Sequence, residues 1–520
     1  MSLQTAYAVF LNRSSSRLLS QVLQQDDRGS LGGLIYMAPQ TLGLSLSIVS
    51  LPGSLTHLRT WRTVVQGRLP LILVVTVFLV LLDRFSVLLA APPSPGRDAG
   101  EQVQSTPAQA EDWSLHFQAT GIYQGYPHFP ARYSGANSLS HNGQIRETAT
   151  VTGFLGRRLW PGAEVYLNPE GFQGLGFNGT RGVAGFPNGE ATKAGGVEPD
   201  AAIARLFLRQ VIGLGGPREW VAGDTNQLAG YRAVSRLTLT VGQLAVPDLF
   251  DANTYSHDPR TQFWNWALWE AGAWDFAANV RGYTQGAAIE LNQAAWAVRY
   301  GAFLPPRTPN GNNLPLRGLT SLSHNLEMEE RHEIFTHPGK VRLLGFFTRA
   351  RMGLFREALH RPGDVNENIA QTRRFGHIKY GGVLNVEQEL GKEVGGFLRG
   401  SWNDGRTEDW AFTQIDRSVA GGVSLRGGRW GRPEDTLGVA SALNGLSGNH
   451  RKFLAAGGLG LIIGDGRLHY TSEGAVEGYY DVKPSEALSL TLDYQFLTSP
   501  GYNRDRGPVH VFGARLHIEF

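Results

Sequence analysis

The 520-residue sequence contains no cysteine. This absence excludes a disulfide framework, a thiolate metal site and a cysteine nucleophile. Long apolar runs are also scarce. The clearest charge-free apolar run, Leu69 to Leu82, has fourteen residues, whereas a transmembrane helix needs about 20. After Trp113 only two short stretches, 263–269 and 351–360, have a helical pattern. Because helical patterns are so scarce, we expect β-strands to be the main secondary structure after Trp113.

The net charge of +3 belongs to the N-terminal part of the chain. Residues 1–91 hold seven Arg and three Asp, and the remainder holds 41 basic and 42 acidic residues. A near-neutral remainder does not point to a nucleic-acid partner. The glycine-rich stretch 174–179 lacks a strand-to-helix context, and His332 and His337 lack the spacing of two zinc ligands on a helix. We therefore expect no cofactor and no metal.

Three segments precede the strand-rich part of the chain. Residues 59–91 place three arginines ahead of the apolar run, as in a secretion signal. An uncleaved anchor is the alternative, but Asp83 and Arg84 oppose it because a central charge costs roughly 2.5–3.5 kcal/mol. Residues 1–58 lack a clear period, and we treat them as an extension of doubtful status. Residues 92–111 are rich in Pro, Ala and Gln, which predicts a disordered linker.

Period-two alternation dominates residues 112–520. In 488–496 and 512–520, apolar residues occupy one face of a strand and mostly polar residues the other. Soluble strands average about five or six residues, whereas transmembrane strands need roughly nine to eleven. The length therefore favours apolar faces toward lipid and polar faces toward a watery lumen. We predict an all-β transmembrane antiparallel β-barrel, closed by the C-terminal strand that ends at Phe520; about sixteen to eighteen strands fit this length.

Several long stretches, in one order, carry a resemblance to a known family. They are Arg132–Leu139, Leu159–Glu170, Gly182–Glu190, Ala204–Gln210, Val241–Gln243, Asp248–Asp251, His257–Phe263, Ala273–Asp275, Pro338–Gly345, Met352–Gly353 and Tyr494–Phe520. With them the chain resembles the carbohydrate-selective outer-membrane porins of the OprB family. The resemblance implies about 16 strands, a Gram-negative outer membrane with its lipid and lipopolysaccharide, and passive diffusion of sugars through a lumen narrowed by inward-folded loops.

A sugar pore needs aromatic rings for the apolar faces of pyranoses, and Arg and carboxylate groups for the hydroxyls. The strand pattern predicts the inward-facing side chains that would supply both. The candidates for pore lining and sugar binding are Arg205, Phe207, Arg209, Arg299, Glu473, Glu477, Tyr479, Asp493, Arg515 and Glu519. We prefer Arg299, Glu477 and Arg209. A lumen residue that only balances a neighbouring charge is the alternative for each of them.

Two further clusters have a functional and a structural interpretation. Trp264, Trp266, Trp269 and Trp274 form the densest aromatic cluster, which could stack sugars but more readily forms an interfacial girdle or the core of a loop. The acidic run Glu327, Glu329, Glu330 and Glu333 is interpreted as a solvated loop, with calcium binding as the weaker alternative.

Alternatives to a sugar porin stay open at this point. They are a general solute or ion porin, a plugged structural or adhesive barrel, an outer-membrane enzyme and, last, a soluble all-β fold. No Ser-His-Asp order and no nucleophile elbow stand out, which argues against the enzyme. The near-neutral chain argues against a dedicated anion pore. The pattern makes no prediction of oligomeric state.

Overall fold

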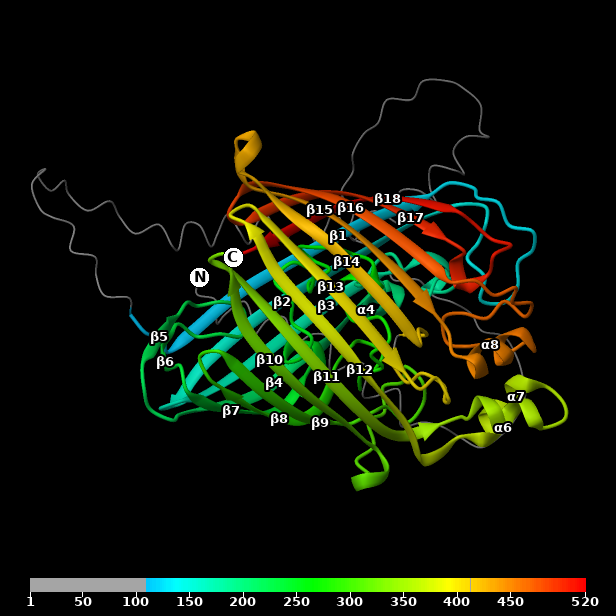
Figure 1. Cartoon of the computed structure of the whole chain (residues 1–520), viewed down its shortest axis with the longest axis horizontal. Coiled ribbons are helices and arrows are strands. Elements are labelled where there is room, and N and C mark those ends of the chain that lie inside the picture. Colours follow the sequence, from blue (N-terminus) through cyan, green and yellow to red (C-terminus); the bar gives the residue numbers. More distant parts are fainter. Residues whose placement is uncertain (1–108, 412) are drawn as a thin grey trace, which may run out of the picture. The chain divides into compact units, whose positions relative to one another are not determined.

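The computed structural model describes residues 109–411 and 413–520. Within this part of the chain, sixteen strands close into one antiparallel barrel (Figure 1). The barrel strands are β1 (Trp113–Tyr126), β2 (Gln144–Trp160), β3 (Ala163–Gly174), β4 (Gly196–Gly213), β7 (Arg236–Leu244), β8 (Thr284–Asn292), β9 (Trp296–Phe303), β10 (Leu322–Ile334), β11 (His337–Met352), β12 (Arg374–Gly391), β13 (Val394–Asn403), β14 (Arg417–Gly427), β15 (Arg432–Gly445), β16 (Glu473–Ser485), β17 (Leu488–Thr498) and β18 (Val509–Glu519). The predictions for residues 1–58 and 59–91, and most of that for 92–111, lie outside the described residues.

Short helices lie in the connections between these strands. The α-helices are α4 (Ala191–Ala194), α5 (Trp266–Trp269), α6 (Phe355–His360), α7 (Val365–Thr372) and α8 (Gly448–Ala455), and the 3-10 turns are η1 (Phe177–Gly179), η2 (Val246–Asp248), η3 (Gly318–Thr320), η4 (Gly428–Trp430) and η5 (Pro500–Tyr502). Among the described residues, no helix has both the length and the apolar character needed to cross a membrane.

The first and last strands close the barrel, and the predicted closure by the C-terminal strand is confirmed. β1 pairs with β18 in an antiparallel register that runs from Gln118 opposite Glu519 to Gly125 opposite Phe512. The amide of Phe117 donates to the carbonyl of Phe520 at 2.8 Å, and the amide of Phe520 donates back at 3.0 Å. Closure leaves no strand edge unpaired, as a lipid environment requires.

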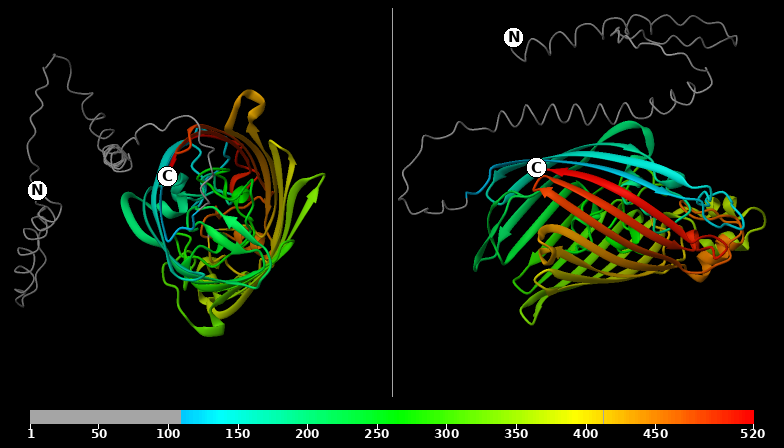
Figure 2. Two further views of the ribbon diagram at one scale, coloured as in Figure 1. Left: turned by 90° about the vertical axis from the view of Figure 1, so that its left-hand side faces the viewer. Right: turned by 90° about the horizontal axis from the view of Figure 1, so that it is seen from above.

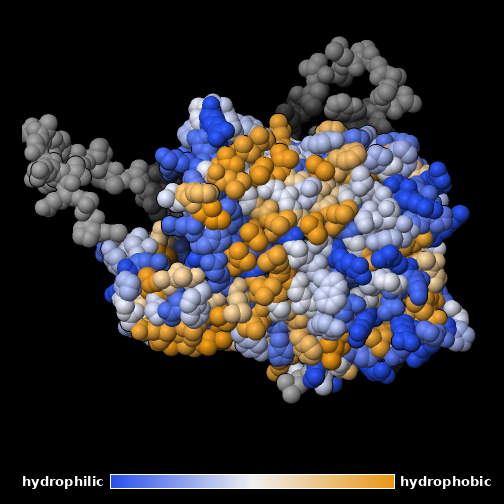
Figure 3. All heavy atoms as spheres, viewed as in Figure 1, coloured by the Kyte–Doolittle hydropathy of each residue, from blue (hydrophilic) through white to orange (hydrophobic). Residues whose placement is uncertain are grey.

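The outer and inner faces of the barrel follow the predicted alternation. On β17, Leu490, Leu492 and Tyr494 are exposed on the outside, whereas Thr491 and Asp493 are buried inside. Apolar residues form much of the visible outer surface across the central strands, and hydrophilic residues gather toward both ends (Figure 3). Each strand thus presents one apolar and one polar face, as transmembrane barrels do.

The two ends of the barrel differ in the length of their connections. One end has tight turns, such as residues 161–162 and 335–336, whereas the other has long loops that contain α6, α7 and α8 (Figure 1). In outer-membrane barrels the short turns face the periplasm and the long loops the exterior. One insertion interrupts the short-turn end: between β4 and β7 the chain forms a separate hairpin of β5 (Arg218–Val221) and β6 (Gly230–Ala233).

The lumen is partly filled by the chain itself. The longest connection, residues 245–283 between β7 and β8, contributes a large share of the main hydrophobic cluster. The view along the barrel shows these green segments inside the ring of strands (Figure 2, left). We call residues 245–283 the inward loop.

One prediction of local structure was wrong, and the two predicted helices are shorter than expected. The acidic run is not a solvated loop, since Glu327 to Glu333 lie on β10 and Glu327 and Glu329 are buried inside the barrel. Arg299 of β9 and Arg342 of β11 flank these two carboxylates and compensate their charge. The helix predicted for 351–360 begins only at Phe355, because β11 continues through Met352; that for 263–269 is limited to α5.

The lipid-facing assignment predicts a depth-dependent effect of charge. Leu384 lies midway along the outward-facing residues of β12 and is 43% exposed. Leu384→Arg should lower the free energy of unfolding in lipid vesicles by about 2–4 kcal/mol, measured by urea titration. The matched variant L384M, which keeps an apolar side chain, should lose less than about 1.5 kcal/mol. Equal stability of L384R and L384M would contradict the assignment.

Candidate functional site

Charged side chains of the barrel wall hold the main chain of the inward loop. Both oxygens of Glu477 on β16 accept loop amides, from Trp264 at 2.6 Å and from Asn265 at 2.9 Å. Arg515 on β18 donates to the carbonyls of Pro259 and Gln262 at 3.0 and 2.9 Å. Both wall side chains are buried. Hydrogen bonds to charged groups are the strong ones, so these contacts fix the path of the loop.

Other inward carboxylates and cations act in the same way. Glu473 on β16 accepts the amides of Ala184, Gly185 and Gly501 at 2.7–2.9 Å, which ties two further loops to the wall. Arg399 on β13 donates to the carbonyls of Leu268 and Ser256 in the inward loop, at 2.8 and 2.6 Å. Barrel charges therefore replace the water that the loop amides and carbonyls would otherwise bind.

The tryptophan cluster forms the core of the inward loop and not a lipid-facing girdle. Trp264, Trp266 and Trp274 are buried inside the barrel. Trp264 packs so closely on β18 that a Cβ added to Gly513 would lie 2.4 Å from its ring, which explains the glycine there. The Nε1 of Trp274 donates to Asn325 on β10 at 3.0 Å. Aromatic packing and wall contacts together stiffen the loop.

A cavity of about 580 Å³ lies between the inward loop, the strand wall and the β5–β6 insertion. Arg205, Phe207 and Arg209 of β4 and Arg299 of β9 line it from the wall. The inward loop contributes Asp248, His257, Arg260, Trp266, Trp269, Phe276, Arg281 and Tyr283, and the insertion contributes Asp224, Thr225, Asn226, Gln227 and Arg232. Its volume is within the roughly 300–1,000 Å³ range of small-molecule pockets.

The seven arginines that line this cavity all pair with carboxylates. The pairs are Arg205 with Asp248, Arg209 and Arg232 with Glu164, Arg236 with Glu219, Arg260 with Glu170 and Glu190, Arg281 with Asp200, and Arg299 with Glu290, Glu327 and Glu329. The cavity wall is therefore rich in hydrogen-bonding groups but carries little uncompensated charge. Such a wall suits a neutral polar solute better than an ion.

Phe207 and Tyr283 lie beside these arginines in the cavity wall, and Tyr166 is buried behind Phe207. The rings of Tyr166 and Phe207 stack with centroids 5.1 Å apart. The guanidinium of Arg209 lies 5.1 Å from the Tyr166 ring and 5.3 Å from the Phe207 ring. Arg205 lies 5.5 Å from the ring of Tyr283. Apolar ring faces and fixed donors thus sit side by side.

Cavity groups on the inward loop keep one protonation state near neutral pH. Burial alone would raise the pKa of Asp248, but the Arg205 guanidinium, 2.6 Å away, outweighs it and holds that pKa below its ordinary value. Burial, with help from the charge of Arg399, lowers the pKa of His257. For Arg260, burial opposes the charge, yet Glu190 and Glu170 raise its pKa well above the usual value. The loop therefore presents a carboxylate, a neutral imidazole and a guanidinium.

The structure divides the ten inward candidates into two groups. Arg205, Phe207, Arg209 and Arg299 line the cavity, whereas the other six do not. Glu473, Glu477 and Arg515 hold loop main chain, as described above. Tyr479 packs against Phe263 with ring centroids 4.9 Å apart, Asp493 accepts from Gln495 at 3.0 Å, and Glu519 lies 3.2 Å from His517.

Several cavity residues were not among the sequence candidates. Asp248 and Arg260 belong to stretches that carry the family resemblance, which was a usable signal. Arg232 and Arg281 lie in the insertion and at the end of the inward loop, where no alternating pattern exists to show which side a residue faces.

Comparison with known proteins identifies the family. The model of the carbohydrate-selective porin family, OprB, matches residues 136–520. The chain belongs to the OprB family. It is a carbohydrate channel of the Gram-negative outer membrane, and its family and fold are those of channels and not of enzymes. No curated protein sequence matches this OprB-family porin.

One solved structure supports this OprB fold. OprB of Pseudomonas putida, solved at high pH, aligns with a TM-score of 0.59 at 16% identity over 79% of this chain and 94% of that one. The DcaP channel of Acinetobacter baumannii aligns with a TM-score of 0.44 at 10% identity, over 80% of this chain and 99% of that one. The first of these likenesses supports the sixteen-stranded barrel.

The anchoring role of Glu477 in this porin can be tested with an isosteric change. In Glu477→Gln, one of the two carboxylate oxygens that accept loop amides becomes an NH₂ group, which can only donate. The free energy of unfolding should fall by about 1–3 kcal/mol, because a buried amide loses its partner, and the open channel should show more current noise. Heat-dependent gel mobility and single-channel recordings measure the two effects. The control E486Q, in the exposed turn before β17, should match wild type in both.

The charge states of the cavity predict how the porin responds to pH. Between pH 8 and 6.5, Asp248 stays ionised and His257 stays neutral, since both pKa values are lowered. Neither group should therefore contribute a pH dependence to sugar block in this interval, as a titration of wild type and H257Q at several pH values would show. The Arg205–Asp248 contribution to stability is fully present above the ordinary carboxyl pKa of 3.8 and is lost as the pH falls through the lower folded-state value. A severalfold change in block between pH 8 and 6.5 that H257Q abolishes would contradict these assignments.

Proposed function

We propose that neutral sugars pass through the cavity between the inward loop and the wall of β4, β8 and β9, and that this cavity is the selective part of the pore. The observation that carries the proposal is the combination of stacked aromatic rings with arginines that are all paired to carboxylates. Diffusion along this path is passive and uses no cofactor.

The proposed roles follow from side-chain chemistry. Arg209 and Arg205 present fixed N–H donors to sugar hydroxyls, and Asp248, the partner of Arg205, accepts hydrogen bonds from hydroxyls. Phe207 and Tyr283 offer ring faces to the apolar faces of a pyranose, and Tyr166 supports Phe207 from behind. Arg299, held by three carboxylates, belongs to the same wall, on β9. Of the remaining candidates, Glu477 and Arg515 hold the inward loop that bounds the cavity.

The barrel surface supports a second part of the proposal, which concerns the partners. Outer-membrane lipid and lipopolysaccharide surround the apolar band formed by residues such as Leu384, Leu398 and Leu492, which are 43%, 51% and 67% exposed. Solutes meet only the polar inner faces of the strands and loops.

Single-channel recording of the full chain in planar bilayers, titrated with glucose and maltose, tests the proposal. Sugar should reduce the current saturably. Arg209→Gln should weaken the apparent sugar affinity about tenfold, equivalent to ~1.4 kcal/mol, because a charged donor is lost at the site. R429Q, in the η4 turn outside the lumen, is the matched control and should leave the block unchanged.

Other outcomes favour other functions. Current steps that neither sugar affects would leave a general solute porin. Absence of current from a folded, heat-modifiable barrel would favour a plugged structural barrel. Equal sugar block in wild type and R209Q would remove Arg209 from the sugar path.

A further inference from the structure

A second set of arginines lies at the end of the barrel with the long loops, away from the cavity. Arg349 and Arg351 project outward from the last residues of β11, since their neighbours Ala350 and Met352 are buried inside. Arg417 begins β14 and also lies on the outer face, because the next residue, Ser418, is buried inside. Arg374, which begins β12 opposite Met352, and Arg317, just before η3, lie at the same end, and the strand pattern assigns them no face. We call these five residues the arginine rim.

The arginine rim sits directly beyond an outward-facing aromatic belt. Phe347 lies two residues below Arg349 on the same face, and it is paired with Tyr380 on β12. Tyr380 and Trp402 meet edge to face at 5.9 Å, and Trp402 is paired with Arg417. Aromatic belts of this kind mark the level of lipid headgroups. The rim guanidinium groups therefore lie where the charged parts of lipids lie.

The rim arginines lack the carboxylate partners that the cavity arginines have. Among the described residues, only Arg374 forms an ion pair, with Glu357 at 3.3 Å. Arg349 and Arg317 lie over aromatic rings instead, 5.5 Å from Phe347 and 4.7 Å from Phe375. Arg351 and Arg417 have no carboxylate within ion-pair distance in residues 109–411 and 413–520. This contrast within one barrel indicates that the compensating charge comes from outside the described part of the chain.

The location identifies the chemistry of that charge. A guanidinium binds phosphate through two parallel N–H···O contacts, and clusters of basic residues at a membrane interface recognise anionic headgroups. The long-loop end faces the exterior, where the lipid of a Gram-negative outer membrane carries phosphorylated glucosamine. We propose that the arginine rim binds the phosphate groups of one such outer-leaflet glycolipid, with the aromatic belt against its acyl chains.

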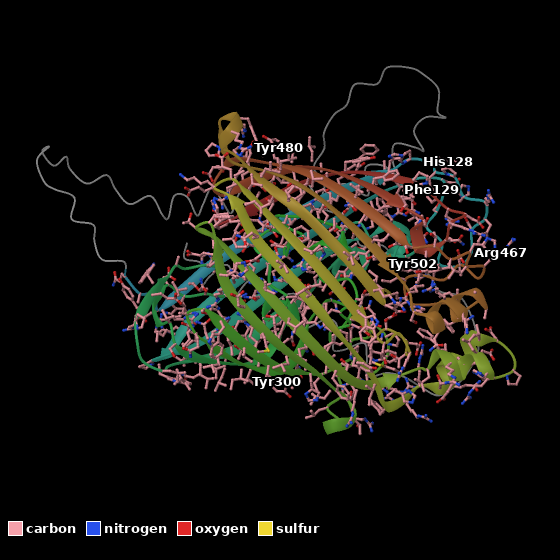
Figure 4. All side chains as sticks on the ribbon, in the orientation of Figure 1. His128, Phe129, Tyr300, Arg467, Tyr480 and Tyr502 are labelled. Atoms are coloured by element: carbon pink, nitrogen blue, oxygen red, sulfur yellow. The ribbon has the colours of Figure 1, made fainter. Side chains whose placement is uncertain are left out.

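The site spans four consecutive strands and so offers separate positions to the phosphates of a headgroup. Strands β11 to β14 are consecutive in the barrel, so Arg417 lies three strands from Arg349 and Arg351. The register places Arg417 level with Gly345 of β11, so Arg349 also lies four residues further along its strand. At about 4.8 Å per strand and 3.3 Å per residue, this separates the Cα atoms of Arg349 and Arg417 by roughly 20 Å. Tyr300 lies on the outer face of β9 (Figure 4), two strands from β11, and forms a 2.7 Å hydrogen bond with His324 of the intervening β10.

The test compares lipid binding by purified full-length protein in detergent, measured by native mass spectrometry. The probes are bisphosphorylated lipid A and the same lipid with both phosphates removed. The variant R349Q/R351Q/R417Q should bind bisphosphorylated lipid A about tenfold more weakly than wild type, equivalent to ~1.4 kcal/mol, with little change for the dephosphorylated lipid. Single-channel conductance and sugar block should not change, since the rim does not line the cavity.

The control removes three arginines from the outside of the opposite end. The control variant is R157Q/R218Q/R429Q. One of its arginines, Arg157, lies 4.1 Å from the ring of Trp113 in the unchanged protein, and this contact resembles that of Arg349 with the ring of Phe347. This variant should bind bisphosphorylated lipid A as wild type does. If the rim triple variant does not fold, R351Q/R417Q replaces it, because neither side chain has a charged partner among the described residues.

Three results would overturn the inference. One is equal wild-type affinity for the two forms of lipid A. Another is equal loss of binding in the rim and control variants. The third is full competition by millimolar inorganic phosphate, which would mean that the rim binds a free anion and not a lipid.

Discussion

The rest of the structure depends on the pairing of backbone amides and carbonyls in a medium without water. Inside a bilayer each unpaired group costs several kcal/mol, so the sheet has no tolerable edge. The mutual hydrogen bonds of Phe117 and Phe520 complete the ladder between β1 and β18. Once the ring is closed, every strand has a lipid side and a lumen side, and the alternation of Leu492 with Asp493 is a direct consequence.

The lumen side then has its own constraint, since it contains many charges in a space that is partly filled by loops. Buried charges need partners, and this porin provides them in two ways. Glu477 and Arg515 find loop amides and carbonyls, and thereby fix the inward loop. Arg205 and Arg299 find carboxylates beside an open cavity, where the same groups remain able to exchange hydrogen bonds with a solute. The inward-facing polar side chains of the strands thus serve two purposes: some hold the inward loop and others face the solute.

The outer surface also shows that the surroundings of a charge decide whether it needs a partner within the chain. The arginines that line the cavity are neutralised by carboxylates of the chain, whereas in the described residues only Arg374 of the arginine rim has a carboxylate partner, and Arg349 rests on the ring of Phe347. An unpaired guanidinium is tolerable at that level because headgroup phosphates and water are at hand. The membrane therefore supplies the negative charge that balances the rim guanidinium groups.

The sequence by itself determined the class of fold, the closing strand and the face of the residues in the alternating segments, because a period of two is a local property that any alternating segment displays. The alternation predicted an inward position for Arg209 and Glu477 alike. Only the tertiary structure decided that Arg209 meets a cavity and Glu477 meets the amides of Trp264 and Asn265, since the path of the inward loop follows from contacts about 200 residues apart. The acidic run on β10 was misassigned for the same reason: four glutamates close together resemble a solvated loop until Arg299 and Arg342, from neighbouring strands, are brought beside them.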